Sequence, residues 1–584
     1  MSVIASEWKE REVSEDIVAE LVAAGYSRLL ARLLAVRGVT AADADAYFTP
    51  ALKDLAKPDE LPGVEPAVET ILEAVHRHAK VVVFGDYDCD GVCATAILVR
   101  ALAVLSCDVV PFIPNRLTEG YGMTDASVAR MLGEHPDVRL VITVDNGVNS
   151  VDLVAKLRAR GIDVVVTDHH LPGEELPDCP IVDPKVASPE KLDGLCGAGV
   201  AFMVANALIN RARAEGLYHG GSVGGPLLVL AGLATITDIM PLRAQNRIIV
   251  TEALKRFRKY APEGLRELLD RASRIGQTSL NSRDFGFLIG PRINAAGRLA
   301  SGMDALRLVL STDREEAREL ARQVDLMNLD RKKVELEMTE EALSKVVKGA
   351  AAQVIDLPNG HQGVAGIVAA RLLERLGQEG SPVPVCVVVR GHGSARAPDG
   401  FNVRDALAAS GDVLTRFGGH AAAGGLSVAD GQIDEFRRRF AEACAVQAAA
   451  IPQNVRGKTF FDAWVDGREL TLEFVEGLSR LEPFGEGNPE PVFAMSGVTL
   501  TDVRPVGSDG RHLQLAFRGA GMPRAIWWSK GEMADELRRD SLRPRDVMFT
   551  AAISTYGERH VELRIQALRD SPFEQSGRQT CSTP

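Results

Sequence analysis

Acidic residues and histidines follow three apolar runs in the first half of this 584-residue chain. The run "VVVF" (81–84) precedes Asp86, Asp88 and Asp90, "RLVITV" (139–144) precedes Asp145, and "IDVVVT" (162–167) precedes Asp168, His169 and His170. A further acid, Asp238, ends the apolar segment "LATIT" (233–237). Carboxylates this close repel one another and lose hydration when they are covered. A positively charged partner is therefore expected among them.

The apolar runs alternate with helical stretches, a pattern typical of an open parallel sheet covered on both faces. The carboxyl ends of parallel strands meet at one edge of such a sheet, so these acids and histidines are expected to converge there. Carboxylates favour Mg²⁺ or Mn²⁺, and imidazole shifts the preference toward Mn²⁺. So many acids exceed the needs of one ion. We expect two ions about 3.5–4 Å apart, which would activate a water for in-line attack on phosphorus.

Each motif alone has an ordinary structural interpretation. A D-x-D pair is commonly a solvated turn, and D-N-G is a common turn sequence. Asp168 could cap the start of a helix, and the two histidines that follow it could simply be exposed. The functional interpretation rests on three successive strands that end in the same way.

The composition indicates a soluble globular protein of several domains, with 46% hydrophobic and 25% charged residues. A cytoplasmic location is expected, because the sequence has neither a membrane-spanning run nor a leader. The eight cysteines form no C-x-x-C pair, which argues against a structural zinc site or a disulfide framework. The net charge of −12 does not by itself indicate nucleic-acid binding, but affinity for phosphates depends on where basic residues cluster.

The pattern along the chain predicts an α/β protein with a second, smaller α/β domain and a small β-barrel near its C-terminal end. Residues 1–80 read as a helical segment, 81–310 as the sheet-bearing domain, 350–452 as the second α/β domain, 453–570 as the barrel and 571–584 as a disordered tail. The charged stretch 311–349 predicts one long connecting helix, and the alternative is two helices with a turn near Asn328.

Basic and aromatic residues are interleaved in the predicted barrel, which suits a groove that holds phosphates while bases stack. They are Arg504, Arg511, Arg518, Arg524, Lys530, Trp527 and Trp528. Side chains alternate along a strand, so one tryptophan should face the core and at most one should be a stacking platform.

The ordered motifs "GDYDCDG" (85–91), "VDNG" (144–147), "TDHH" (167–170) and "FGGHAAAGG" (417–425) resemble those of the DHH phosphoesterase superfamily. The similarity covers nearly the whole chain and is strongest to the bacterial single-strand-specific 5′→3′ exonucleases of that superfamily. It implies a DHH catalytic domain, a DHHA1-type substrate-binding domain and an oligonucleotide-binding (OB) barrel.

The resemblance also implies roles for individual residues. The implied metal ligands are Asp88, Asp90, Asp145, His169 and Asp238, with Asp145 as the bridge between the ions. Asp86 either completes the first metal site or orients its ligands. His170 resembles the family residue that touches the reacting phosphate.

Substrate-binding residues are expected in four further motifs. Gly418 and Gly419 would let the backbone approach a phosphate, to which His420, Arg396 and Ser394 could donate hydrogen bonds. The alternative is an ordinary glycine-rich turn between a strand and a helix. Further candidates are Asn294 and Arg298 in "GPRINAAGR" (290–298), and Arg116 and Tyr121 in "PNRLTEGYG" (114–122).

The expected function is exonucleolytic release of mononucleotides from the 5′ end of single-stranded DNA, in repair and recombination, with Mn²⁺ or Mg²⁺ as cofactor. The expected enzyme is a monomer without membrane contacts that works with a helicase and a single-strand-binding protein. Two alternatives remain open. One is a phosphodiesterase for oligoribonucleotides or cyclic dinucleotides, and the other is a replication scaffold without catalysis.

Overall fold

The computed structural model describes residues 7–572 apart from 121, 188, 273–279, 379, 381, 452–457, 508, 520 and 555–557. The predicted tail from 573 onward lies outside the described residues. The chain forms two compact units. The larger comprises residues 50–450 and 483–488, and the smaller comprises the described parts of 1–49, 451–482 and 489–584.

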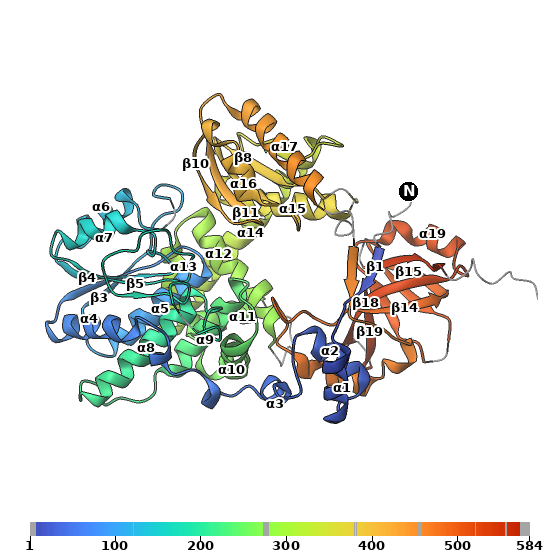
Figure 1. Cartoon of the computed structure of the whole chain (residues 1–584), viewed down its shortest axis with the longest axis horizontal. Helices are drawn as coiled ribbons and strands as arrows, with labels where there is room; N and C mark the ends of the chain where they lie inside the picture. Colours follow the sequence, from blue (N-terminus) through green and yellow to red (C-terminus); the bar gives the residue numbers. More distant parts are fainter. Residues whose placement is uncertain are drawn as a thin grey trace, which may run out of the picture. The chain divides into compact units, whose positions relative to one another are not determined.

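A five-stranded parallel sheet organises the first half of the larger unit (Figure 1). Its order is β3-β2-β4-β5-β6, from Val109–Phe112, Lys80–Phe84, Val138–Val144, Asp163–Thr167 and Ile181–Val182. Phe84 pairs with Thr143, Val144 with Thr167, and Thr167 with Val182, so β2, β4, β5 and β6 end nearly level. The residues just after these strands therefore gather at one edge.

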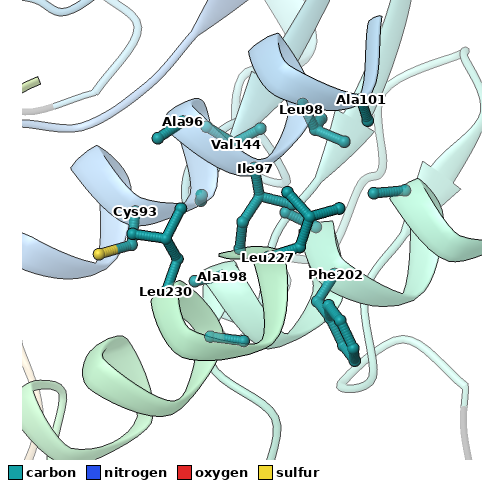
Figure 2. Close-up of a cluster of buried hydrophobic side chains, with 14 of the residues drawn as sticks. Cys93, Ala96, Ile97, Leu98, Ala101, Val144, Ala198, Phe202, Leu227 and Leu230 are labelled. Carbon is teal, nitrogen blue, oxygen red and sulfur yellow. The ribbon is translucent and has the colours of Figure 1, made fainter. Parts of the chain in front are cut away.

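Helices cover both faces of this sheet, as continuous Val and Ile runs require. Val81 and Val83 of β2 pack into one core with α4 (Val64–His76), α5 (Cys89–Ala103), α8 (Gly197–Ala214) and α9 (Gly224–Thr237). Val82 and Phe84 pack into the opposite core with α6 (Asp125–Glu134) and α7 (Val151–Arg158). Figure 2 shows Ile97 of α5, Phe202 of α8 and Leu230 of α9 in the first of these cores.

Further helical segments of this half follow α9 in the chain. They are α10 (Ala244–Tyr260), α11 (Glu263–Ala272), the π-helical segment η3 (Asp284–Ile289), α12 (Gly290–Leu299) and α13 (Gly302–Leu310). Short 3₁₀ turns precede α4, at Leu52–Asp54 and Pro58–Glu60.

One unbroken helix, α14 (Arg314–Ser344), follows, so the alternative of two helices with a turn near Asn328 does not hold. Asp313 caps its N-terminus by accepting from the Glu316 amide at 2.8 Å. At about 1.5 Å per residue it is about 47 Å long.

The second α/β domain packs on the C-terminal part of α14, through Met338 and Ala342. Its sheet has the order β10-β11-β9-β8-β7, from Leu414–Gly419, Ala423–Val428, His392–Arg396, Val385–Val389 and Gln353–Asp356. Its helices are α15 (Ala365–Gln378), α16 (Val403–Ala408) and α17 (Ile433–Ala450), with short turns at Gln362–Val364 (η4) and Gly411–Val413.

The smaller unit contains a seven-stranded sheet of order β13-β14-β18-β19-β17-β16-β15. These strands are Ala463–Trp464, Phe493–Val498, Arg545–Ser554, His560–Asp570, Arg524–Trp527, His512–Phe517 and Leu500–Val506. Helices α18 (Leu472–Leu478) and α19 (Ala534–Arg539) and three short turns, Gly467–Glu469, Ser479–Leu481 and Gly531–Met533, complete it.

The N-terminal segment contributes α1 (Glu15–Ala23), α2 (Arg28–Val36) and α3 (Ala44–Phe48), as a helical segment should. It also contributes a strand, β1 (Glu7–Glu10), which pairs in parallel with β12 (Lys458–Phe461). The described residues contain no helix with both the length and the apolar character needed to cross a membrane.

Gly63 gives a stability prediction for the sheet that carries the acids. It has φ +85°, and a Cβ atom there would lie 1.8 Å from the carbonyl oxygen of Ile181 in β6. We expect Gly63→Ala to lower the free energy of unfolding by about 2–5 kcal/mol, through strain and displacement of β6. Gly161→Ala is the matched control, since φ is +72° and nothing lies within 4 Å. It should cost only about 1–2 kcal/mol. Urea unfolding measures both, and equal losses would contradict the role of the Gly63 contact.

Candidate metal centre

The strand ends bring the predicted acids and histidines to one edge of the parallel sheet. Asp86 follows β2, Asp145 follows β4, and Asp168 to His170 follow β5. Asp238 joins them from the C-terminal end of α9. These residues form three groups, and within each group the ligand atoms lie within 4.8 Å of one another. The groups are Asp86, Asp88 and Asp145; Asp90, His169 and Asp238; and Asp145, His169 and His170.

The loop after β2 is held by its own backbone. The Asp88 carboxylate caps α5, and its Oδ1 accepts from the amides of Asp90 at 2.9 Å and Gly91 at 3.0 Å. Asn294 accepts from the Cys89 amide at 2.7 Å through its Oδ1. Asn294 is therefore placed to hold this loop, whereas the sequence suggested only a contact to substrate.

Asp90 lies buried against the N-terminus of α8. Its two carboxylate oxygens accept from the amides of Gly197 at 2.7 Å and Ala198 at 2.8 Å. The positive end of the helix dipole favours a carboxylate at this position. Asp90 Oδ2 also lies 3.7 Å from His169 Nε2, so the residue fixes α8 to the site.

Asp145 occupies a strained, buried position. Its φ is +60°, in the left-handed region that Asp tolerates better than most residues. A Cβ atom on Gly197 would lie 2.7 Å from the Asp145 Cβ, so only glycine permits α8 to begin this close to it. The Asp145 carboxylate is directed at His169, with Oδ1 3.0 Å from Nε2.

His169 is the meeting point of the site. Its Nε2 lies 3.0 Å from Asp145, 3.7 Å from Asp90 and 3.7 Å from Asp238. Burial lowers the pKa of His169 below its ordinary value, which favours the neutral imidazole that binds metals. Three carboxylates from three different elements thus surround one imidazole nitrogen.

Asp168, like Asp90, is bound within the protein through both of its carboxylate oxygens. Oδ2 accepts from the Val148 amide at 3.0 Å, and Oδ1 lies 2.7 Å from Nδ1 of His170. Burial opposes a charge on His170, but the hydrogen bond and charge of Asp168 outweigh it and raise the pKa of His170 to about 9. The pair thus presents a cationic imidazole beside the acids.

Burial and mutual repulsion disfavour the charged forms of the acids. Burial, together with the charge of Asp88, holds the pKa of Asp86 well above its ordinary value. The pKa of Asp145 is also held well above its ordinary value, by burial and then by the charges of Asp90 and Asp88. The same causes raise the pKa of Asp238 to about 9. Asp86 Oδ1 is buried without a hydrogen-bond partner. This donor set, with an orphaned oxygen and crowded carboxylates, fits divalent cations of the Mg²⁺ and Mn²⁺ type.

A group of arginines lies near these acids. The Arg116 guanidinium lies 5.0 Å from the centre of the Tyr87 ring. Burial lowers the pKa of Arg298 to about 10 and also lowers the pKa of Arg396. In both cases the like charge of Arg116 is the second cause. Arg298 also donates to the Gly363 carbonyl of η4 at 3.2 Å, which ties α12 to the second domain. Three neighbouring guanidinium groups form a basic cluster suited to phosphate.

Ser394 and Arg396 lie together on β9. Arg396 Nη1 donates to Ser394 Oγ at 3.0 Å. A Cβ atom on Gly366, in the first turn of α15, would lie 2.9 Å from Ser394 Oγ and 3.1 Å from an Arg396 nitrogen. The helix N-terminus, the hydroxyl and the guanidinium therefore meet at one place.

The glycine-rich motif forms a hairpin between β10 and β11, which corrects the alternative of a turn between strand and helix. Gly419 has φ +136°, Gly418 pairs with Gly425, and the His420 amide donates to Ala423 at 2.8 Å. The exposed residues of β10 leave this hairpin open to a ligand. Tyr121, the remaining predicted substrate contact, lies outside the described residues.

In the smaller unit, one of the two adjacent tryptophans is buried and the other is exposed, as strand alternation predicts. Trp527 is 6% exposed and Trp528 is 54% exposed. Trp528 packs edge-on against His512, with ring centroids 4.6 Å apart. Arg504 and Arg511 pair with Asp502 and Asp509, at 2.6 Å each, so part of the basic charge is neutralised locally.

A fourth strand end carries an acid that the sequence patterns did not reveal. Asp183 follows β6, is 2% exposed, and has one oxygen bonded to the Lys185 amide while Oδ2 is buried without a partner. Burial raises the pKa of Asp183 to about 7. The apolar pair of β6 is too short to be recognised as a strand, so only the repeated pattern of acids after strands could have indicated this residue.

Comparisons with known proteins agree with this architecture. The model of the DHH family N-terminal domain matches residues 80–220, the DHHA1 domain model matches 347–446, and the RecJ OB domain model matches 461–567. The fold and site thus define a phosphoesterase of the DHH class. The chain belongs to the RecJ family.

The single-stranded-DNA-specific exonuclease RecJ of Salmonella typhimurium is 35% identical, over 88% of this chain and 90% of that protein. The RecJ proteins of Bacillus subtilis and Thermus thermophilus are 33% and 38% identical, over 90% and 81% of this chain. This chain covers only 66% and 67% of those two relatives.

Solved structures of RecJ from Thermus thermophilus are also similar. The complex with Mn²⁺ has a TM-score of 0.82 and 31% identity, covering 97% of this chain and 79% of that one. The complex with Mg²⁺ has a TM-score of 0.76 and 30% identity, and the match covers 97% of this chain and 78% of that one.

The close contact of Gly197 with Asp145 gives a prediction for metal binding. Gly197→Ala should displace Asp145 and loosen the amides that hold Asp90, and so weaken Mn²⁺ binding by about tenfold or more. Isothermal titration with Mn²⁺ measures this. Gly199→Ala, on the same helical turn, meets Leu195 at 3.3 Å and should bind Mn²⁺ like the wild type. Equal Mn²⁺ affinity in Gly197→Ala and the wild type would contradict the close packing of α8 on the site.

Proposed function

We propose that this chain is a single-stranded-DNA-specific exonuclease that hydrolyses phosphodiesters from the 5′ end and releases mononucleotides. The observation that carries the proposal is the position of His169, whose Nε2 lies within 3.7 Å of carboxylates on three separate elements. The 5′→3′ polarity follows from the resemblance to the family, since no distance in the site distinguishes the two ends of a strand.

Asp86, Asp88, Asp90, Asp145, His169 and Asp238 would together hold two divalent cations, Mn²⁺ or Mg²⁺. When bound, such a pair supplies Lewis acidity at the phosphate and a nucleophilic water. Asp145 and His169 each belong to two of the three groups of neighbouring ligand atoms, and Asp145 is the natural shared ligand because a carboxylate offers two oxygens.

The remaining side chains act on the phosphate itself. Asp168 orients the His170 ring through Nδ1 and stabilises its positive charge, so that His170 can donate a hydrogen bond to a phosphate oxygen. We assign the cluster of Arg116, Arg298 and Arg396, with Ser394, to an adjacent phosphate of the strand. Gly418, Gly419 and His420 would let the backbone of the hairpin approach it.

The smaller unit would hold the rest of the strand. Trp528 offers an exposed aromatic face on which a base can stack without regard to sequence. We further propose that the protein acts in the cytoplasm as a monomer, during DNA repair and recombination, and that a helicase and a single-strand-binding protein supply and protect its substrate. Its domain boundaries are proposed at residues 80, 310, 349, 452 and 570.

Replacement of Asp145 tests the proposed reaction. With end-labelled single strands and Mn²⁺, the wild type should release mononucleotides from the 5′ end, and chelation of the metal should abolish this. Asp145→Asn should lose at least about 10³-fold in rate, because one shared ligand serves both ions. Its affinity for single strands, measured by fluorescence anisotropy, should remain.

Three results would contradict the proposal. Full activity in Asp145→Asn would exclude the shared-ligand role. Cleavage of dinucleotides but not of long strands would favour a small-substrate phosphodiesterase. Binding without any turnover would favour a scaffold.

Arg396 tests the assignment of the basic cluster. Arg396→Ala should raise KM for single strands about tenfold, the effect of losing a charge-assisted hydrogen bond, and leave Mn²⁺ affinity unchanged. Arg404→Ala, at an exposed position on α16 in the same domain, is the control and should match the wild type. Loss of Mn²⁺ binding in Arg396→Ala would contradict the division of roles between the two domains.

A further inference from the structure

The helix that carries Asp238 ends in an unusual way. After Thr237, the Ile239 amide donates to the Ile236 carbonyl at 3.2 Å and the Met240 amide donates to the Thr235 carbonyl at 3.1 Å. This pair of bonds is a Schellman motif, which places the residue after the C-cap in the left-handed region. Ile239 has φ +58° and occupies that position.

Isoleucine is a poor choice there. The left-handed conformation crowds a Cβ atom, and a β-branched side chain suffers most, so glycine is usual. Among the described residues with positive φ, Ile239 is the only β-branched one. Two other helices of this unit end in Schellman motifs without glycine, but with His78 and Ser106.

Packing within the chain does not explain the isoleucine. Its side chain is 70% exposed, so little of it contributes to the core. Ile236, one turn earlier, faces the protein instead, and a Cβ atom on Gly286 of η3 would lie 3.4 Å from it. Backbone strain without compensating burial indicates a role outside the fold.

The position of Ile239 indicates what that role is. It follows Asp238 directly, and Asp238 Oδ2 lies 3.7 Å from His169 Nε2. Another large apolar side chain, Phe287, is 71% exposed in η3, the segment that packs against the end of α9 through Gly286. Two exposed apolar side chains thus lie on segments that meet at the end of α9, and one of them directly follows Asp238.

We propose that Ile239 is a substrate-contact residue, which packs against the base or deoxyribose of the nucleotide whose phosphate lies at the metal centre. This inference rests on the proposed exonuclease function and extends it to one residue. An apolar contact does not read sequence, as a non-specific nuclease requires. A contact to the base also needs that base to be unstacked, because a duplex hides the base faces, and in that case Ile239 would contribute to the preference for single strands.

Ile239→Gly separates this role from a structural one, because the two predict opposite effects. Glycine relieves the strain, so the melting temperature should stay the same or rise, and Mn²⁺ affinity should be unchanged. KM for a 5′-phosphorylated oligothymidylate should rise about tenfold through loss of the contact, with kcat changed less than about threefold. Ile239→Asn, which tolerates the left-handed region but is polar, should behave like the glycine variant, and Ile239→Val should stay close to the wild type.

His78→Gly is the matched control, since it makes the same backbone change at the exposed end of α4. It should keep wild-type kinetics. An unchanged KM in Ile239→Gly would overturn the inference, and so would a lower melting temperature, which would make the side chain structural. A wild type that degrades no single strand would instead overturn the proposed function, and with it this contact.

Discussion

The structure depends on holding several carboxylates together in a buried place where they repel one another. Asp86, Asp90 and Asp145 are almost inaccessible to water, and Asp88 and Asp238 lie beside them. A protein interior stabilises a lone carboxylate poorly, and several together still less. The chain compensates part of this charge with backbone amides, and two divalent cations would compensate the rest. The hydrogen bonds around Asp88, Cys89 and Asp90 keep this cluster together.

The compensation is divided among a few elements of the fold. The N-terminus of α8 binds Asp90, and the first turn of α5 binds Asp88. Gly197 permits the approach of α8 to Asp145, and Gly91 permits that of α5 to Asp86. The two histidines, although adjacent, have different surroundings. His169 turns toward the acids, whereas His170 is held by Asp168, which stabilises its positive charge.

The convergence of these residues could be predicted because it follows from a parallel sheet, in which strands separated by many residues end at one edge. Strand alternation also predicted that one of the two tryptophans faces the core, and Trp527 is the buried one. Contacts that depend on exact register or packing could not be predicted in this way. The amides of α8 on Asp90, the Asn294 bond to Cys89 and the positive φ of Ile239 all depend on how distant elements meet. The pairing of β1 with β12 could not be predicted from sequence patterns either, because some 450 residues separate the two short strands.

Crystals of the protein soaked in Mn²⁺ and measured at the manganese absorption edge would test the central claim most directly. We predict two anomalous peaks at the edge of the parallel sheet, both within bonding distance of Asp145 and at least one within bonding distance of His169. Manganese bound elsewhere, or a single ion that touches neither residue, would contradict the claim.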